Sequence, residues 1–432
     1  MNLLAGPARM ASVLPAEPGA QTMTLLEAAR ALLATGSLCD ACLGRPVADR
    51  SFGLTNEERG RALRTGVALA DDEPYADPDA DCWVCEGHCA RFDAYADRLV
   101  DALGETELYT YQVGTRVPPL LEENGRLLRE QAGFDPEAGE PLKRELNREV
   151  GRRLGATLGA EVDFERPDVQ FLLDLDADAV EVRRNSVTVY GRYRKLQRGL
   201  PQTEWDAYET SVEEHVAPPF LGAFRATDAV FHGAGREDVD ALMLGPGRPF
   251  VLELKEPRRR DADLDALAAE ATGETVELEG LAFVTHETIA RVKGHDATKT
   301  YRATVALAES VTEAALDAAL ADLDGATVDQ RTPTRVDHRR ADTVRERAVL
   351  SVDGALTDDR TAVVDVHGEG GLYIKELMSG DGGRTEPSLA GLLGVDVTVE
   401  TLDVLDVEGV DEPFLTPAYR RDRDGEPASP PW

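Results

Sequence analysis

Four of the five cysteines occur as two Cys-x-x-Cys pairs, and no other feature constrains the fold of the N-terminal part of the chain as strongly. The pairs are Cys39 with Cys42 and Cys82 with Cys85, separated by 39 residues. Two such pairs bring four thiolates into a tetrahedron around zinc, and a shell made only of cysteines is structural. The separation exceeds the usual zinc-ribbon spacing. We therefore predict a structural zinc site at these four cysteines, with disulfides or redox use as the alternative.

The expected compartment disfavours that alternative. The first residues lack the basic-then-apolar pattern of a signal peptide, and the sequence has no apolar run of about 18 residues that would span a membrane. We therefore expect a cytoplasmic protein without a membrane partner, where disulfides are rare. Cys89 and His88 are further potential ligands, which we expect to be spectators.

The charge of the chain is strongly unbalanced. It carries 81 acidic and 47 basic residues, for a net charge of −34, and only six of the basic residues are lysines. Taken alone, this charge argues against nucleic acid, because phosphate binding normally uses an excess of Lys and Arg. However, acidity spread along the whole chain is typical of a surface adapted to concentrated salt. The net charge therefore indicates that the protein works in concentrated salt, and it does not define the function.

One segment departs from this acidity. Residues 183–198 contain six basic residues and no acidic one, with Tyr190 and Tyr193 among them. Aromatic faces beside cationic groups are typical of single-stranded RNA binding. We therefore predict an RNA-contacting surface that uses Arg192, Arg194 and Lys195. The alternative is a chance cluster of arginines on a solvated strand.

The pattern of apolar residues predicts a mixed α+β chain without regular βαβ alternation. In the second half, strands are expected at 239–244 and 249–255, with a glycine-rich turn between them, and at 371–375. A proline pair in 212–220 suggests a domain boundary. The expected division is a flexible leader, an N-terminal domain, a second domain and a disordered tail, at 1–22, 23–218, 219–418 and 419–432.

The strongest candidate for chemistry is the segment Gly235-Arg-Glu-Asp238. A carboxylate at a turn before a strand is held on a rigid scaffold, so Asp238 is a candidate nucleophile or base, although a turn-capping role is the simpler alternative. A rival interpretation is a metal-dependent nuclease that uses Asp238 or Asp240 with Glu253 and Lys255. The sequence contains no P-loop, HExxH or GxSxG motif.

Two later segments complete an ordered set of motifs. Lys299-Thr-Tyr-Arg-Ala-Thr-Val305 and Gly371-Leu-Tyr-Ile-Lys375 follow the Asp238 segment, and in this order the three resemble the signature segments of pseudouridine synthases. The wider chain, from about residue 35 to 415, resembles the archaeal tRNA pseudouridine synthases of the Pus-ten family. Further matching segments are the cysteine pairs, 53–60, 191–195, 200–205 and 211–214.

The resemblance implies an architecture and a substrate. It implies a zinc-binding N-terminal part with a THUMP-like RNA-binding module, followed by a pseudouridine synthase domain built on a mixed, largely antiparallel sheet. The implied substrate is uridine at positions 54 and 55, in the TΨC arm of tRNA. Catalysis would need no cofactor, and we expect no obligate protein partner. A haloarchaeal source would suit the composition.

The resemblance also assigns roles to individual residues. Asp238 matches the catalytic aspartate of the family, and Lys375 matches its basic partner. Tyr301 matches the aromatic residue that packs on the target base, whereas Tyr373 and Arg236 are expected to contact the substrate. An ionised carboxylate in a dry pocket starts the reaction, and a neighbouring lysine would stabilise its charge.

One position departs from the family pattern. Leu242 stands where the family usually has arginine, which puts an auxiliary ion pair in doubt. Besides the nuclease, a non-catalytic, zinc-containing RNA-binding module remains an alternative. That module would bind tRNA without isomerising uridine.

Overall fold

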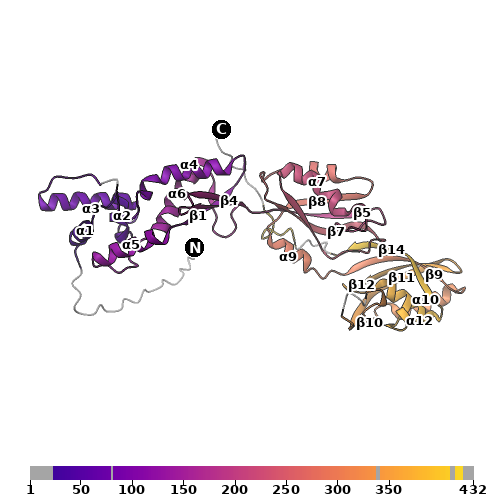
Figure 1. Cartoon of the computed structure of the whole chain (residues 1–432). Coiled ribbons are helices and arrows are strands. Elements are labelled where there is room, and N and C mark those ends of the chain that lie inside the picture. Colours follow the sequence, from indigo (N-terminus) through magenta and orange to yellow (C-terminus); the bar gives the residue numbers. More distant parts are fainter. Residues whose placement is uncertain (1–22, 79–80, 337–340, 409–413, 422–432) are drawn as a thin grey trace, which may run out of the picture. The chain divides into compact units, whose positions relative to one another are not determined.

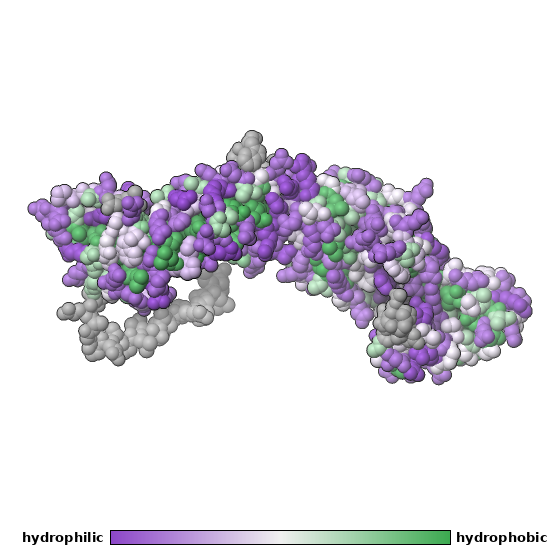
Figure 2. Space-filling view, in the orientation of Figure 1, coloured by the Kyte–Doolittle hydropathy of each residue, from purple (hydrophilic) through white to green (hydrophobic). Residues whose placement is uncertain are grey.

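The structure is a computed structural model, which describes residues 23–78, 81–336, 341–408 and 414–421 (Figure 1). The expected leader, 1–22, lies outside the described residues. Hydrophilic residues cover most of the face seen in Figure 2. Within the described part of the chain, no helix is both long and apolar enough to cross a membrane. The chain divides into two compact units: Met1–Ala102, Val113–Thr157 and Leu172–Glu181 form the first, whereas Leu103–Gln112, Leu158–Phe171 and Val182–Trp432 form the second.

Helices dominate the first part of the chain. Capping boxes start two of them, because the side chains of Thr24 and Thr55 accept hydrogen bonds from backbone N–H groups three residues later and glutamates reciprocate. Two glycines allow the second and third helices to touch: a Cβ on Gly44 or Gly60 would lie 1.9 or 1.8 Å from a backbone oxygen of the facing helix. The helices are α1 Leu25–Leu33, α2 Asp40–Gly44, α3 Asn56–Asp71, α4 Phe92–Leu103, α5 Pro119–Gln131 and α6 Leu142–Leu158.

A four-stranded sheet is formed by one strand between α4 and α5 and three strands after α6. Its order is β2-β1-β3-β4, with β1 parallel to β2. The side chains of β3 alternate between buried and half-buried positions, as expected for a strand with one face on a core. The strands are β1 Thr110–Arg116, β2 Glu161–Val162, β3 Val169–Asp174 and β4 Ala179–Arg184.

The second unit is built on a ten-stranded sheet. Nine strands run in the order β13-β10-β11-β12-β9-β14-β7-β5-β8, and β6 pairs with β7. Strands β14 and β7 are parallel, whereas β9 pairs antiparallel with both β12 and β14. The predicted mixed, largely antiparallel sheet is confirmed. Its strands are β5 Val187–Lys195, β6 Asp228–Gly233, β7 Leu242–Lys255, β8 Val276–Phe283, β9 Lys299–Leu307, β10 Thr327–Arg331, β11 Val344–Asp358, β12 Thr361–Gly368, β13 Thr385–Glu386 and β14 Val397–Val407.

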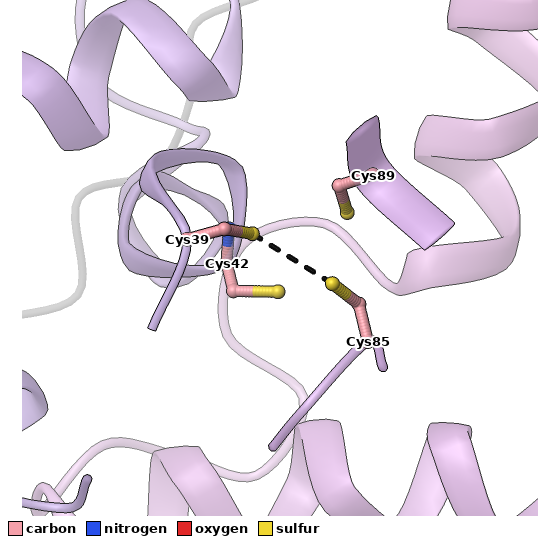
Figure 3. A group of neighbouring side chains, drawn as sticks. All are labelled: Cys39, Cys42, Cys85 and Cys89. Atoms are coloured by element: carbon pink, nitrogen blue, oxygen red, sulfur yellow. Dashed lines mark hydrogen bonds between the residues drawn. The ribbon is translucent and has the colours of Figure 1, made fainter. Parts of the chain in front are cut away.

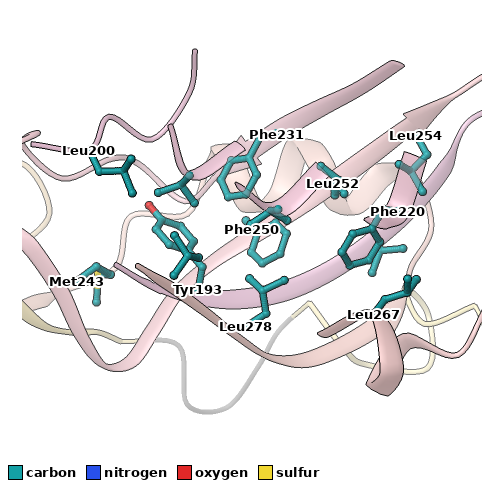
Figure 4. Close-up of a cluster of buried hydrophobic side chains, with 14 of the residues drawn as sticks. Tyr193, Leu200, Phe220, Phe231, Met243, Phe250, Leu252, Leu254, Leu267 and Leu278 are labelled. Atoms are coloured by element: carbon teal, nitrogen blue, oxygen red, sulfur yellow. The ribbon is translucent and has the colours of Figure 1, made fainter. Parts of the chain in front are cut away.

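Two hydrophobic cores stabilise this sheet. In the first, Phe231 and Phe250 stack with ring centroids 4.7 Å apart, and Phe220 packs nearby (Figure 4). The second core lies among β9, β12 and the later helices. Tyr301 packs against both cores, so it marks the seam between them. The helices of this unit are α7 Val212–Phe224, α8 Leu264–Ala271, α9 Glu287–Lys293, α10 Glu313–Leu323, α11 Ile374–Ser379 and α12 Leu389–Leu393.

The contacts do not divide the chain at the expected boundary between residues 218 and 219. Strand β5 lies between β7 and β8 in the ten-stranded sheet, and α7 continues through Pro218 and Pro219. The proline pair therefore lies inside a buried helix and marks no linker. Burial of Phe220 and Phe224 explains why this helix persists, since tertiary packing overrides local propensity.

Three local predictions also need correction. The two strands expected at 239–244 and 249–255 form the single strand β7, which accommodates the glycine-rich segment as a register shift against β5. Residues 371–375 form no strand; a turn leads into α11 at Ile374. The expected tail began at residue 419, but the Tyr419 carbonyl accepts a hydrogen bond from Thr285 and the Arg421 N–H donates one to Phe283. Residues 422–432 lie outside the described residues.

Candidate functional site

Asp238 lies on the loop between β6 and β7, beside two cationic side chains. Lys375 Nζ is 3.2 Å from its Oδ2, and Arg335 Nη1 is 3.6 Å from the same oxygen. The Asp238 side chain is 38% exposed, so solutes can reach it. Both cations therefore lie within ion-pairing distance of the Asp238 carboxylate.

Lys375 is held by the start of α11. Buried Gln330 fixes the preceding backbone, because its side chain accepts a hydrogen bond from the Tyr373 N–H and donates one to the Tyr373 carbonyl. Lys375 also bonds Asp240, with Nζ 3.0 Å from Oδ2. Burial alone would raise the pKa of Asp240, but the hydrogen bond and charge of Lys375 lower it overall.

Arg335 belongs to a short 3-10 turn, Thr334–Val336. Its Nε donates to the buried carboxylate of Glu376 at 2.8 Å. Burial works against the charge of Arg335, but the Glu376 hydrogen bond outweighs it and raises the pKa of the guanidinium. Arg335 therefore presents a permanent positive charge to Asp238.

Two clefts meet at Asp238. The first, which we call the Tyr301 cleft, has a volume of about 410 Å³, and its walls include Tyr301, Tyr373 and Leu402. Burial raises the pKa of Tyr301, so its ring stays neutral. A cleft with aromatic and aliphatic walls and a carboxyl group at its edge suits a planar, polar ring.

The second, which we call the Trp205 cleft, has a volume of about 550 Å³ and is walled by residues 201–205. The two clefts share five lining residues: Arg236, Glu237, Asp238, Arg335 and Lys375. They are thus neighbouring compartments with Asp238 on their common wall.

A buried network fixes the loop that carries Asp238. The carboxylate of Glu237 is fully buried and accepts hydrogen bonds from Tyr193 Oη at 2.8 Å and Arg248 Nε at 2.9 Å. Lys195 Nζ lies 3.6 Å from the same carboxylate and donates to the backbone carbonyls of Asp238 and Val239, at 3.1 and 3.2 Å. Burial lowers the pKa of Lys195, while Glu237 opposes this shift.

The cysteines form a separate cluster in the first unit. The sulfurs of Cys39, Cys42, Cys85 and Cys89 all lie within 4.8 Å of one another and point toward a common centre (Figure 3). Cys39 and Cys42 come from the start of α2, whereas Cys89 lies on the 3-10 helix His88–Arg91. All five cysteines are free thiols. Four thiol donors at this spacing fit a tetrahedral metal site.

Comparisons with known proteins match this architecture. The family description "Pus10, C-terminal" covers residues 188–408, and "Pus10 THUMP domain, archaeal" covers residues 95–174. The "tRNA pseudouridine synthase Pus10" of Halorubrum lacusprofundi is 55% identical over 428 residues, covering 93% of this chain and 100% of that protein. The chain belongs to the Pus10 family.

A second relative agrees with this assignment. The "tRNA pseudouridine synthase Pus10" of Pyrococcus furiosus is 39% identical, covering 89% of this chain and 98% of that protein. Among solved structures, a Cbf5-Nop10-Gar1 complex matches with a TM-score of 0.31 and 19% identity, covering 50% of this chain and 48% of the other. The THUMP domain and the haloarchaeal affinity predicted from the sequence are confirmed.

The structure brings together the residues that the Pus10 resemblance singled out. Asp238, Lys375, Tyr301, Tyr373 and Arg236 all line the Tyr301 cleft. Sequence analysis missed Arg335, Glu237, Arg248 and Gln330. A signal existed for Glu237, which precedes Asp238 in the same motif, but the other three lie far along the chain in unremarkable segments.

Burial removes two of the three residues of the predicted RNA-contacting surface from solvent. Lys195 is completely buried, and Arg192 is buried with its guanidinium donating to the carbonyls of Pro246, Gly247 and Val407. Arg194 pairs with Glu277 at 2.7 Å. These cations hold backbone and acidic groups of their own sheet, because β5 is a central strand. Tyr190 and Tyr193 are buried as well.

The residues of the nuclease interpretation do not gather at one site, because Glu253 and Lys255 pair with each other away from both clefts at Asp238. Glu253 bonds Ser186, His232 and Lys255 and lines neither cleft at Asp238. Among the described residues, the metal-competent group of His, Cys, Asp and Glu side chains is the cysteine cluster.

The cysteine cluster departs from the predicted ligand set in one member. Cys89, expected to be a spectator, belongs to the group, whereas Cys82 does not. Cys82 is buried and its thiol interacts with those of Cys39, Cys42 and Cys85, so it borders the group without belonging to it. Arg45 is also buried and donates to Cys42 Sγ at 3.0 Å, which places a positive charge beside the thiols.

Proposed function

We propose that this chain isomerises uridine to pseudouridine at positions 54 and 55 of tRNA, and that Asp238 is the catalytic residue. The observation that carries this proposal is the position of Asp238, between Lys375 and Arg335 at the edge of the Tyr301 cleft. The family provides the reaction, and the cleft provides the dimensions and chemistry of a uracil site.

The reaction suits these groups. The bond between N1 of uracil and C1′ of ribose breaks, the base turns, and a bond forms between C5 and C1′. The proton on C5 is lost and one is gained at N1, so atoms balance without an oxidant, a hydrolytic water or a cofactor. An ionised carboxylate begins the reaction either at the sugar carbon or as a base.

The surrounding residues hold the base while it is detached. A uridine in a tRNA arm must leave its stack to reach Asp238. Tyr301 then offers a ring face to the uracil, and Tyr373 and Arg236 line the same cleft. Lys375 and Arg335 pair with the Asp238 carboxylate and hold it at the edge of the cleft.

The test uses purified full-length protein and an unmodified tRNA transcript. Asp238→Asn is expected to abolish pseudouridine formation, measured by chemical mapping of each uridine. Asp240→Asn is the matched control, because Asp240 also bonds Lys375 but is 70% exposed, and it should retain activity. Pseudouridine made by Asp238→Asn would refute the assignment.

The same assay tests the other components of the proposal. Modification at residues other than 54 and 55 would contradict the assigned positions. Cleaved RNA would instead favour a nuclease, and binding without modification would favour a binding module. Activity of the purified chain alone is expected, since we propose that no protein partner is obligatory.

We also propose that zinc occupies the cysteine cluster. Thiolates of Cys39, Cys42, Cys85 and Cys89 would hold it, and the ion would stabilise the fold of the first unit. Four thiolates around Zn²⁺ carry a net charge of −2, which is costly to bury. Buried Arg45 beside Cys42 and Cys89 offsets part of this charge.

A further inference from the structure

The Trp205 cleft is not explained by the isomerisation of one uridine. It shares five lining residues with the Tyr301 cleft, Asp238 among them. Its outer wall carries Trp205, whose side chain is 46% exposed. An exposed tryptophan side chain gains free energy when a ligand covers it. Its position beside the site therefore indicates that a ligand binds there.

We propose that the Trp205 cleft binds the base of the nucleotide next to the target uridine, by stacking on the indole ring of Trp205. This inference rests on the proposed function, because the target uridine must occupy the Tyr301 cleft. A flipped uridine remains covalently joined to its neighbours, and neighbouring compartments with a common wall suit two consecutive nucleotides.

The ring of Trp205 is supported for such a role. Tyr208 lies 5.2 Å away between ring centroids, tilted by 52°, and its N–H donates to the Trp205 carbonyl at 2.9 Å. Tyr208 therefore supports the indole ring, and Trp205 stays 46% exposed beside it. Stacking on an aromatic ring tolerates every base, because each base has a π face.

The wall that carries Trp205 is tied to the loop that carries Asp238. Lys195 Nζ donates to the Leu200 carbonyl at 2.9 Å as well as to the Asp238 carbonyl. Gln202 Nε2 donates to Tyr193 Oη at 2.7 Å and to the Gly235 carbonyl at 3.0 Å. The same buried groups thus set both loops, and Leu200 and Tyr193 share one core (Figure 4).

The far end of this wall is also anchored. The Glu213 N–H donates to the Gln202 carbonyl at 3.0 Å, and the Glu213 carboxylate accepts from the backbone of Phe231 and Glu204. Trp205 follows directly in sequence. Hydrogen bonds to α7, β5 and β6 therefore hold the loop that carries Trp205 beside the Asp238 loop, as a specificity site requires.

The overall charge of the protein favours this mode of binding. At −34 the chain gains little from long-range attraction to phosphates, and concentrated salt would screen what remains. Base stacking is much less sensitive to ionic strength. An aromatic contact beside the active site therefore supplies affinity where phosphate contacts are weakened.

The test is a stacking measurement with inactive enzyme. Asp238→Asn protein is mixed with tRNA that carries 2-aminopurine next to uridine 55, on either side in separate transcripts. Stacking should quench the fluorescence at one of the two positions, and Trp205→Ala added to Asp238→Asn should abolish this quenching. Tyr75→Ala is the matched control, because Tyr75 is 44% exposed but lies in the acidic 71–81 loop.

A kinetic cycle completes the test. Trp205→Ala should lower kcat/KM about tenfold, whereas Trp205→Phe should retain most of it. A tRNA with an abasic site next to the target uridine should lower kcat/KM of the wild type by a similar factor. The same tRNA should not lower kcat/KM of Trp205→Ala further. Additive losses, or equal effects of Trp205→Ala and Tyr75→Ala, would overturn the proposal. Wild-type activity in the same assay keeps this outcome distinct from failure of the proposed function, in which no pseudouridine forms.

Discussion

Lys195 Nζ lies 3.1 Å from the backbone carbonyl oxygen of Asp238, and the Lys195 side chain is completely buried. A buried ammonium bonded to carbonyls is held for its geometry, because its desolvation is costly unless its donors are satisfied. Its bonds to the Leu200 and Val239 carbonyls use its other donors. Lys195 is therefore a positioning residue for the Asp238 loop.

Replacing Lys195 should separate positioning from RNA binding. Lys195→Met removes the donors to three carbonyls and one neighbour of Glu237, so we expect unfolding to become easier by about 3 kcal/mol. The single-turnover rate should fall about 10- to 100-fold, because small displacements of a reacting group are costly. Urea unfolding, single-turnover kinetics and tRNA affinity measure these effects.

The tRNA affinity of Lys195→Met distinguishes a positioning role for this segment from a role in RNA contact. With Lys195 as a positioning residue, tRNA affinity should change by less than about twofold, a small free energy. Arg183→Met is the control, because Arg183 is an exposed cation in the same segment and should leave the rate unchanged. Weakened affinity with an unchanged rate in Lys195→Met would restore the RNA-contact interpretation.

Arg335→Gln should slow the reaction without unfolding the protein. The guanidinium is 41% exposed, so its ion pair adds less than about 1 kcal/mol to stability. Glutamine still donates to Glu376 but removes the charge beside Asp238, and we expect the single-turnover rate to fall about tenfold. Arg302→Gln is the control, since Arg302 pairs with Asp365 on the same sheet. Equal rates in both variants would contradict a role for Arg335.

Metal content should identify the fourth cysteine. We expect one zinc per purified wild-type chain by elemental analysis, loss of zinc in Cys89→Ala and retention in Cys82→Ala, because Cys89 belongs to the sulfur group and Cys82 does not. Chelation should unfold the first unit, since the ion supplies part of its folding free energy. Loss of zinc in Cys82→Ala with retention in Cys89→Ala would instead support the two Cys-x-x-Cys pairs as the ligands.

The residues that would carry out the chemistry could be predicted from the sequence, whereas most of the residues that hold them in place could not. Asp238, Tyr301 and Lys375 stand in short motifs, and those motifs converge on one cleft because the β6–β7 loop, β9 and the start of α11 meet there. Arg335 has no motif and lies on a short turn almost a hundred residues after Asp238. Only the folded chain brings them together.

Local patterns failed where partners come from distant backbone. The cations of β5 suggested a solvated strand, but carbonyls from Pro246, Leu200 and Val407 satisfy Arg192 and Lys195. The sequence shows where a charged residue lies in the chain, but not which backbone carbonyls face its side chain in the folded protein. Similarly, Gly371–Lys375 has the residue types of a strand, yet the Tyr373 backbone bonds the Gln330 side chain in place of a neighbouring strand.

The last prediction concerns Glu253, which stabilises the fold apart from the active site. Burial alone would raise the pKa of Glu253, but hydrogen bonds from Lys255, Ser186 and His232 lower it to about 2 from an ordinary value of 4.5. A depressed folded-state pKa stabilises the protein above the unfolded pKa. This contribution, about 3 kcal/mol, is lost as the pH falls from 4.5 toward 2.

The difference between wild type and Glu253→Gln isolates this effect from the rest of an acidic chain. Denaturant unfolding at pH 7 should show the wild type more stable by about 3 kcal/mol, and the difference should shrink by roughly half at pH 3, where the unfolded-state glutamate is mostly protonated. Glu346→Gln, at an exposed position on β11, controls for loss of one negative charge and should match the wild type at both pH values. A difference that stays constant between pH 7 and pH 3 would mean that Glu253 acts through packing, because only an ionisation linked to folding makes the free energy of unfolding depend on pH.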